Sequence, residues 1–317
     1  MIDEKIIARI ARQLAEGDVV DGLVEGLPPT DLQSLMLHVY RARSARRSPS
    51  EIMAQYERSL TLRPSAAHPR ALIEVERMAF ESASAFEALD LAPIAPLGIN
   101  QVFGRIDQNN CLATVRNAEV MADPTTVKAL ECARRRRGGE KDTIRLCSRS
   151  RQLRLQPFDG PGFSPHFGLF SIVTAGRDRG GLMFETESLR EQIGVYIELL
   201  RRLTAAGYGF EDISINISDT ARDPARLGRA EQEVLEPLAR TAPYITFRLD
   251  HDREQGRGYY TGLCLSIYAT DPTGQRCNLA DGGFTDWTAR LLSNSKERLL
   301  VSGMGIELIP KRFAGVS

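Results

Sequence analysis

The second half of this sequence alternates between segments rich in β-branched and aromatic residues and short polar turns, which limits the possible folds more than any other feature. Several of these segments follow one another across only a few residues, as at the turn Asp271-Pro272-Thr273-Gly274, which favours antiparallel hairpins. Strands are expected at 102–115 (a hairpin), 144–156, 166–176, 213–217, 244–249, 259–269 and 299–308. Helices are expected at 70–85, 123–137 (capped by Asp123 or Thr125), 188–206 and 287–292. The pattern predicts an α+β fold with a mostly antiparallel sheet flanked by helices.

The N-terminal region has a different pattern of apolar residues, which predicts a helical extension over residues 1–66, with the core at 67–317. Ile6, Ile7, Ile10 and Leu14 recur at helical spacing. Ser48 is placed to cap a helix whose first residue is Pro49, and the proline-containing segment 63–69 is interpreted as a linker. The arginines at 41–47 indicate either a solvated helix face or a contact with nucleic acid.

The composition argues against several classes of protein. The 317 residues carry 41 Lys and Arg against 41 Asp and Glu, and 42% are apolar, as in ordinary globular proteins. No apolar run approaches the ~20 residues of a membrane span, and the charged N-terminus does not resemble a signal peptide. We therefore expect a cytoplasmic protein without a membrane partner. The five cysteines are scattered singly and there are four histidines, which argues against disulfides and metal sites.

The zero net charge conceals a basic stretch at 134–154. It holds nine cations and two acids, a local excess of seven positive charges. One interpretation is a phosphate-binding or carboxylate-binding region around Arg154, because guanidinium groups hold such anions bidentately. The other is a helix C-terminus followed by a solvated strand edge. The usual Gly-rich phosphate loops, GxGxxG and GxxxxGK[ST], are absent from the sequence.

The most specific motif is Gly258-Tyr259-Tyr260-Thr261-Gly262, followed after a hairpin by Gly282-Gly283-Phe284-Thr285-Asp286. These segments resemble the catalytic core of histidyl-tRNA synthetase and its paralogue, the regulatory subunit of ATP phosphoribosyltransferase. The resemblance implies a pocket for a small amino-acid-like molecule. Its substrate-binding residues would be Tyr259, Tyr260, Thr261, Gly262, Gly282, Gly283 and Asp286.

Three further segments occur in the order that this resemblance implies. Residues 86–93 resemble the dimer-forming motif of class II synthetases, and 301–307 their Gly-rich third motif. Residues 154–156, a loop and 166–170 resemble the second motif, which embraces ATP. The resemblance implies catalytic roles for Arg154 and Gln156, nucleotide binding by Arg154, His166 and Phe170, ATP with Mg²⁺ as cofactor, and a homodimer formed through residues 70–105.

The departures from the family pattern concern charged positions. Gln156 stands where the second motif has Glu, and Leu308 where the third motif has the arginine that holds the triphosphate. The arginine before the tyrosine motif falls on Gln255, and Arg253 or Arg257 would replace it only if the strand register shifted. No acidic residue is evident around 123–126 for the substrate's α-amino group. Because the sequence ends soon after the third motif, an anticodon-binding domain and a tRNA partner are not expected.

Several positions have a second interpretation. Tyr259 and Tyr260 alternate along the expected strand, so one ring would face the pocket and the other a cross-strand neighbour. Asp286 is placed either to hold an ammonium group or to cap the helix at Trp287. Gly282 and Gly283 indicate a close approach of a ligand or simply β-bulges. His166 is either a packing residue or an acid–base group.

Two functions remain open. The first is a synthetase-like paralogue that binds an amino-acid-like ligand and forms an acyl-adenylate with ATP without charging tRNA. The second is a non-catalytic regulatory subunit of a biosynthetic enzyme, which would act through an enzyme partner. The retained Arg154 favours the first, and the missing third-motif arginine favours the second.

Overall fold

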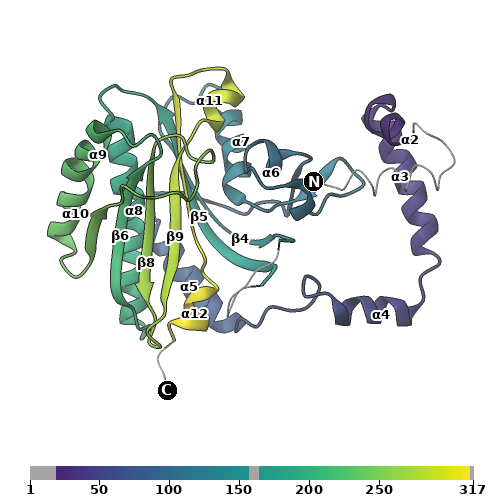
Figure 1. The fold of residues 1–317 in the computed structure, drawn as a ribbon, viewed down its shortest axis with the longest axis horizontal. Coiled ribbons are helices and arrows are strands. Elements are labelled where there is room, and N and C mark those ends of the chain that lie inside the picture. The colour runs from purple at the N-terminus through teal and green to yellow at the C-terminus, as the bar shows by residue number, and fades with distance from the viewer. Residues whose placement is uncertain (1–18, 157–163, 315–317) are drawn as a thin grey trace.

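The protein is described by a computed structural model that covers residues 19–156 and 164–314 (Figure 1). Its centre is an eight-stranded sheet in the order β1-β4-β5-β10-β9-β8-β6-β7. Five of the seven strand pairings are antiparallel, and only the outermost pairs, β1 with β4 and β6 with β7, are parallel. This confirms the expected α+β fold with a mostly antiparallel sheet.

Some strands of this sheet are separated by helices along the chain, whereas β4 and β5, and likewise β7, β8 and β9, follow one another directly. In sequence order the strands are β1 (Glu87–Leu89), β4 (Ile144–Leu153), β5 (His166–Arg177), β6 (Glu211–Asp219), β7 (Thr246–Leu249), β8 (Leu263–Thr270), β9 (Arg276–Thr285) and β10 (Glu297–Met304). The second sheet pairs β2 (Ile94–Pro96) with β3 (Ala118–Val120).

One face of the large sheet is covered by four helices, α5 (Pro69–Ser82), α8 (Met183–Ala205), α9 (Pro224–Ala230) and α10 (Glu236–Thr241). On α8 the buried residues Leu189, Ile193, Tyr196, Leu200 and Leu203 recur every three or four positions, which places them on one stripe toward the sheet. A π-helical turn, Glu231–Leu235, joins α9 to α10. The apolar period of these helices therefore builds the larger core.

The opposite face is covered only in part, by α7 (Pro124–Arg137) and α11 (Trp287–Leu292). Ala129 and Cys132 of α7 and Trp287 of α11 pack against strand residues such as Leu299 and Val301. On β10 the neighbouring Leu300 belongs to the other core, as the alternation of side chains along a strand requires. The face that these two helices leave uncovered carries the candidate site. The last helix, α12 (Leu308–Arg312), follows β10 and contacts α5.

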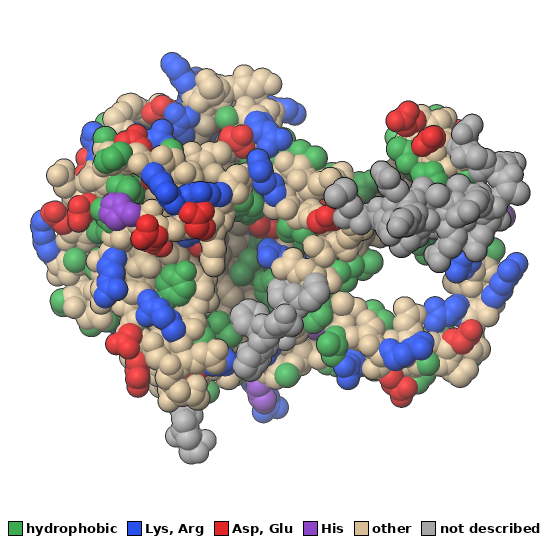
Figure 2. Space-filling model, in the orientation of Figure 1, with side chains coloured by type: hydrophobic (Ala, Val, Ile, Leu, Met, Phe, Trp, Pro, Cys, Tyr) green, Lys and Arg blue, Asp and Glu red, His purple; other side chains and the backbone are tan. Residues whose placement is uncertain are grey.

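The described part of the N-terminal region is helical. It comprises α2 (Val19–Asp21), a π-helical turn at Gly22–Gly26, α3 (Pro29–Ser44) and α4 (Pro49–Arg58), and it extends away from the sheet (Figures 1 and 2). Ser48 caps α4 in a reciprocal capping box with Glu51, as its position predicts. None of the residues in these helices is buried. The expected periodicity at 6–14 lies outside the described residues.

The hairpin predicted at 102–115 is wrong. The structure has α6 (Ile99–Val102), a 3₁₀ turn at Gln108–Asn110 and an isolated bridge between Ala113 and Glu119. The segment folds around buried Asn100, whose backbone N–H donates to Glu119 Oε1 at 2.8 Å and whose side-chain amide donates to the Val120 carbonyl at 3.2 Å. A buried polar pair needs such partners, and this pairing is not local in the sequence.

Candidate functional site

A cavity of about 430 Å³, here called the central cavity, lies on the partly uncovered face of the sheet. It is formed by the start of α7, the segment after β4, the start of β5, the turn before β8, and strands β9 and β10. Its polar lining consists mainly of Asp123, Arg154, Tyr259, Tyr260 and Asp281. The site therefore combines segments that are far apart in the sequence.

Tyr259 and Tyr260 both face the central cavity, so the expected alternation along a strand is wrong. Strand β8 begins only at Leu263, and the tyrosines lie in a turn in which both of their N–H groups donate to the Gly256 carbonyl. Gly256 and Gly258 adopt φ values near +79°, a left-handed conformation that glycine adopts readily. The two rings meet edge to face with their centroids 4.7 Å apart.

Each tyrosine donates a hydrogen bond to a carboxylate. Tyr259 donates to Asp123 Oδ2 at 2.6 Å, and Tyr260 donates to Asp281 Oδ2 at 2.9 Å. Burial, together with these carboxylates, raises the pKa of both phenols well above their usual range. Both hydroxyl groups therefore stay protonated at neutral pH and act as donors.

Asp123 has a structural and a site role at once. Its Oδ1 accepts hydrogen bonds from the N–H and the hydroxyl of Thr125 at 2.9 and 2.6 Å, which caps α7 as predicted. Its Oδ2 accepts from Tyr259. The sequence pattern predicts Asp123 or Thr125 as a cap and indicates no acid near 123–126 for the substrate's α-amino group. Asp123 provides such an acid, because one oxygen of its carboxylate caps α7 while the second oxygen faces Tyr259 in the site.

Arg154 provides the cation that lines the central cavity. Its Nε donates to the Ala122 carbonyl at 3.1 Å, and its guanidinium carbon lies 5.8 Å from the centre of the Phe167 ring. Neither terminal nitrogen of Arg154 forms a hydrogen bond to another described residue. The guanidinium is thus held at Nε, while its two terminal nitrogens remain available to bind an anion.

A second guanidinium, that of Arg253, contacts the tyrosine–carboxylate network without lining the central cavity. Arg253 lies 2.9 and 3.0 Å from the two carboxylate oxygens of Asp281, and its guanidinium carbon is 5.6 Å from the centre of the Tyr260 ring. Burial raises the pKa of Asp281, while Arg253 opposes that shift. The turn that contains Gly256 and Gly258 places Arg253 beside Asp281. Arg257 instead pairs with Glu254 at 2.8 Å. Asp281 lies two residues before Gly283 on β9, so both residues are on the same face of the strand. This spacing could have identified Asp281 from the sequence.

The structure does not bring every predicted site residue to the central cavity. Phe170 is fully buried in the core against Phe80, with ring centroids 5.6 Å apart. His166 lies in a separate cavity beside the linker, where its Nδ1 is 2.8 Å from Arg151 and its Nε2 is 2.7 Å from the Arg63 carbonyl. Gln156 is not among the residues that line the central cavity, and part of the loop after it lies outside the described residues. The placements of Phe170 and His166 do not support nucleotide binding.

The residues of the tyrosine and glycine motifs do not all lie at the same cavity. Gly283 leaves room for Tyr260, because a Cβ there would lie 2.7 Å from the tyrosine ring, and Gly282 leaves room for β10. Thr261, Gly262 and Asp286 line a different cavity at the end of the sheet. Asp286 precedes α11 without a side-chain capping bond, so the capping interpretation of that residue is not supported.

The basic stretch at 134–154 is mostly neutralised by carboxylates from elsewhere in the chain. Arg135 pairs with Glu87, Arg145 with Glu191, and Arg151 with Glu307. Basic and acidic side chains are accordingly interspersed over the face shown in Figure 2. Arg154 is the member of this stretch that lines the central cavity. The local charge excess therefore reflects ion pairing more than a broad anion-binding surface.

The described residues contain no cluster of three or more His, Cys, Asp and Glu side chains arranged to hold a metal ion. Among the helices in the described part of the chain, none is long and apolar enough to cross a membrane.

Comparison with solved structures identifies the fold. Histidyl-tRNA synthetase from S. aureus matches with a TM-score of 0.55 and 13% identity, covering 76% of this chain and 64% of its own. A protein from Bacillus halodurans, described as an ATP phosphoribosyltransferase regulatory subunit/histidyl-tRNA synthetase, matches with a TM-score of 0.56 and 12% identity, over 78% of this chain and 82% of its own.

A histidine–tRNA ligase subunit from Alicyclobacillus acidocaldarius is similar to the same extent, with a TM-score of 0.54 and 12% identity over 78% of this chain and 94% of its own. No protein-family model and no curated protein sequence matches the chain. This chain spans less than two thirds of the length of the S. aureus enzyme. About three quarters of this chain thus has a class II synthetase-like fold, which it shares with histidyl-tRNA synthetase and with the phosphoribosyltransferase regulatory subunit.

Proposed function

We propose that the protein binds a small amino-acid-like molecule in the central cavity and acts as a non-catalytic, ligand-binding subunit. The observation that carries this proposal is the presence of opposite charges in one cavity: the free terminal nitrogens of Arg154, and the carboxylates of Asp123 and Asp281 bound by tyrosines. Arg154 would hold the ligand's carboxylate, and Asp123 its ammonium group. A zwitterion of this kind complements both charges.

The charges of the cavity also argue against binding of a triphosphate. Two carboxylates and one guanidinium line it, and Arg253 beside it is paired with Asp281, so there is no excess of positive charge. Condensation with ATP concentrates negative charge and requires several fixed cations. Leu308, at the position of the third-motif arginine, starts α12 and packs against the apolar core. A role without ATP therefore fits the residues better than adenylate formation.

An ATP-dependent ligase is the second candidate, and one observation favours it. Arg154 follows β4 directly, immediately before the segment that resembles an ATP-embracing loop, and its terminal nitrogens could hold a phosphate. ATP with Mg²⁺ would supply the leaving group for activation of a carboxylate. Arg154 would then orient the α-phosphate, and Tyr259 with Asp123 would hold the substrate's ammonium group.

Binding and exchange measurements separate these candidates. Each of the twenty amino acids is titrated by calorimetry into the wild type and the Arg154→Ala variant. Because a charge-assisted hydrogen bond contributes about 1.5–3 kcal/mol, Arg154→Ala is expected to weaken binding roughly ten- to a hundredfold. The control is Arg240→Ala, which removes an exposed guanidinium that pairs, within the described part of the chain, only with Glu236 on α10, and should leave binding unchanged. Equal affinities for wild type and Arg154→Ala would contradict the proposed ligand orientation.

Amino-acid-dependent exchange between pyrophosphate and ATP tests the ligase directly. We expect no exchange with any amino acid that binds. Exchange in the wild type that disappears in Arg154→Ala would establish the ligase and exclude a purely regulatory role.

A regulatory role would require an enzyme partner, and a subunit of that kind is among the structural neighbours. A homodimer through residues 70–105 is likewise proposed. It is supported by four exposed apolar side chains in that segment, Ile73, Ile94, Leu97 and Val102. The cytoplasmic location stays a prediction.

A further inference from the structure

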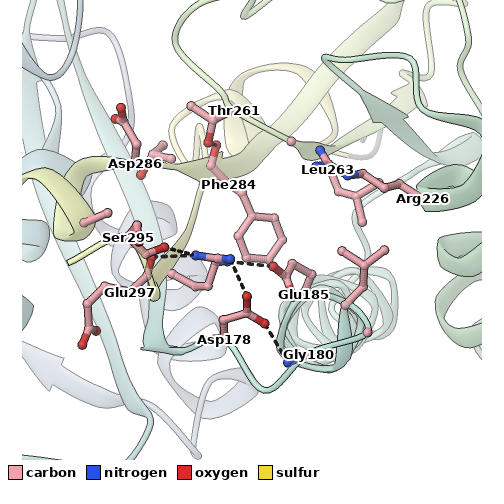
Figure 3. A pocket seen from close by; sticks show the side chains of 16 residues that line it. Asp178, Gly180, Glu185, Arg226, Thr261, Leu263, Phe284, Asp286, Ser295 and Glu297 are labelled. Carbon is pink, nitrogen blue, oxygen red and sulfur yellow. Dashed lines mark hydrogen bonds and ion pairs between the residues drawn. The ribbon is translucent and has the colours of Figure 1, made fainter.

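A second cavity, of about 600 Å³, lies at the end of the sheet where α8 begins (Figure 3). It is lined by the loop 178–182, the first turn of α8, the end of β9 and the start of β10, with Arg226 of α9 on the opposite side. Its volume lies within the range of small-molecule sites, ~300–1,000 Å³. No part of the function proposed above uses this cavity.

Three side-chain oxygens at this cavity lack hydrogen-bond partners among the described residues. One of them, Glu297 Oε2, lies 3.3 Å from Arg136 Nε in an ion pair, which leaves Thr285 Oγ1 and Glu185 Oε2. Thr285 is only 4% exposed, yet its Oγ1 has no partner. Glu185 uses Oε1 to accept from Arg298 Nε at 2.9 Å, and its buried Oε2 is unpaired. A buried polar atom without a partner costs about 1–3 kcal/mol, so such atoms are normally satisfied. A ligand that donates hydrogen bonds would satisfy both.

One of these two oxygens selects the kind of donor. Four carboxylates line the cavity, those of Asp178, Glu185, Asp286 and Glu297, against the guanidinium groups of Arg226 and Arg298. Arg298 is occupied, since it also donates to Asp178 Oδ2 at 2.6 Å (Figure 3). Glu297 is also paired with Arg136 and Arg177, and Asp286 with Arg290, so the overall charge does not decide the kind of donor. Glu185 Oε2 does, because a carboxylate oxygen binds a charged ammonium group more strongly than a neutral hydroxyl or amide donor.

Arg226 adds an anion-binding element. Its nearest carboxylates, Asp219 and Asp223, are 3.7 and 3.6 Å away, beyond hydrogen-bond distance, so its guanidinium forms ion pairs but no hydrogen bond to a described residue. Leu182, at the N-cap of α8, provides no side-chain cap for the backbone N–H groups of the first turn. Donors for a carboxylate therefore line the same cavity as the acceptors for an ammonium group.

We infer that the second cavity is a binding site for a free amino acid, which it holds as a zwitterion. The ammonium group lies on Thr285 Oγ1 and Glu185 Oε2, and the carboxylate lies on Arg226 and the first turn of α8. This site is independent of the central cavity, and either can exist without the other.

Calorimetry with matched probes tests both ends of the ligand. Lysine, ornithine, arginine and histidine are each compared with the decarboxylated amine and with the Nα-acetyl amino acid. For the amino acid that binds, the acetyl derivative should lose binding because it has no ammonium group. The amine should bind at least tenfold more weakly because it cannot reach Arg226. An amine that binds as tightly as its amino acid, or no binding of any probe to a site that depends on Arg226 or Thr285, would overturn the inference.

Variants assign the binding to this cavity. Arg226→Met should weaken binding at one site at least tenfold, and Thr285→Val, which keeps the side-chain shape, about five- to tenfold. Thr285→Ser, which retains the hydroxyl, should restore it. Arg154→Ala serves as the comparison, since it affects only the central cavity. Binding abolished by Arg154→Ala and untouched by Arg226→Met and Thr285→Val would refute the second site. Failure of the central site alone would leave one site per chain that Arg154→Ala does not affect.

Discussion

Replacing Gly282 by alanine is expected to lower the free energy of unfolding by about 3 kcal/mol, the upper end of what overpacking a core produces. A Cβ at this position would lie 2.6 Å from the Val301 carbonyl oxygen and would collide with Ser302. These residues belong to β10, whose Ser302 is directly opposite Gly282 in the sheet. Ser302 cannot retreat, because its hydroxyl is hydrogen-bonded to Tyr196 and Gln192 of α8 at 2.9 and 2.6 Å. Urea denaturation followed by circular dichroism measures the loss.

The matched control is Gly194→Ala within α8. A Cβ at Gly194 meets no atom within 4 Å, and the residue lies in the interior of a 23-residue helix. Alanine is favoured over glycine there by about 1 kcal/mol, so this variant should be more stable than the wild type. If Gly282→Ala were as stable as the wild type, the close approach of β9 and β10 would be contradicted.

Lys128 is expected to make stability depend on pH in the neutral range. This lysine is fully buried between α7 and the sheet, and its Nζ donates to Ser148 Oγ and to the Ser171 carbonyl, both at 2.8 Å. It also contacts Ser171 Oγ, and no hydrogen bond or ion pair to a carboxylate is found among the described residues. Burial without a counter-charge lowers the pKa of Lys128 from 10.5 to about 7.

The sign follows from proton binding. Between pH 7 and 10 the unfolded chain keeps a proton on this lysine that the folded protein has released, so the free energy of unfolding rises with pH. The contribution approaches about 1.4 kcal/mol per pH unit, or roughly 2–3 kcal/mol between pH 6 and 9. Below about pH 7 the lysine is protonated in both the folded and the unfolded state, so this pH dependence disappears and the full cost of burying the charge remains.

Lys128→Met should remove this contribution. The wild type is therefore expected to gain stability relative to the variant as the pH increases. Burial raises the pKa of Cys264 to about 12, which acts in the opposite direction, but Lys128 does not contribute to that shift, so the effect is the same in both proteins. Lys141→Met, on an exposed lysine, provides the control with no such change. A constant difference between wild type and Lys128→Met from pH 6 to 9 would show that Lys128 stays charged in the folded protein.

The elements that could be predicted from the sequence are those whose pattern is local. The stripe on α8 and the caps at Ser48 and Asp123 depend on residues a few positions apart, and the structure confirms them. The segment at 102–115 could not be predicted, because its course depends on Asn100 meeting Glu119 across the chain. Its β-rich composition was outweighed by that buried polar contact.

The candidate site shows the same division. The tyrosine motif, and Arg154 from the basic stretch and the second-motif resemblance, are brought together in one cavity. The pairing of Tyr259 with Asp123 spans 136 residues, and that of Arg253 with Asp281 spans 28, so neither follows from spacing. Gly256 and Gly258 were the available signal that the strand starts later, since two glycines so close together favour a turn.

The short parallel strands at both margins of the large sheet limit how this chain meets other chains. β1 and β7 contain three and four residues, and each is the outermost strand of its side. An incoming strand therefore finds only a few unpaired backbone groups on β1 and β7 themselves, although β4 continues to Leu153, beyond its pairing with β1 at residues 146–148. Strand addition onto the two outermost strands is disfavoured, and a partner that meets them would rely mainly on side-chain contacts.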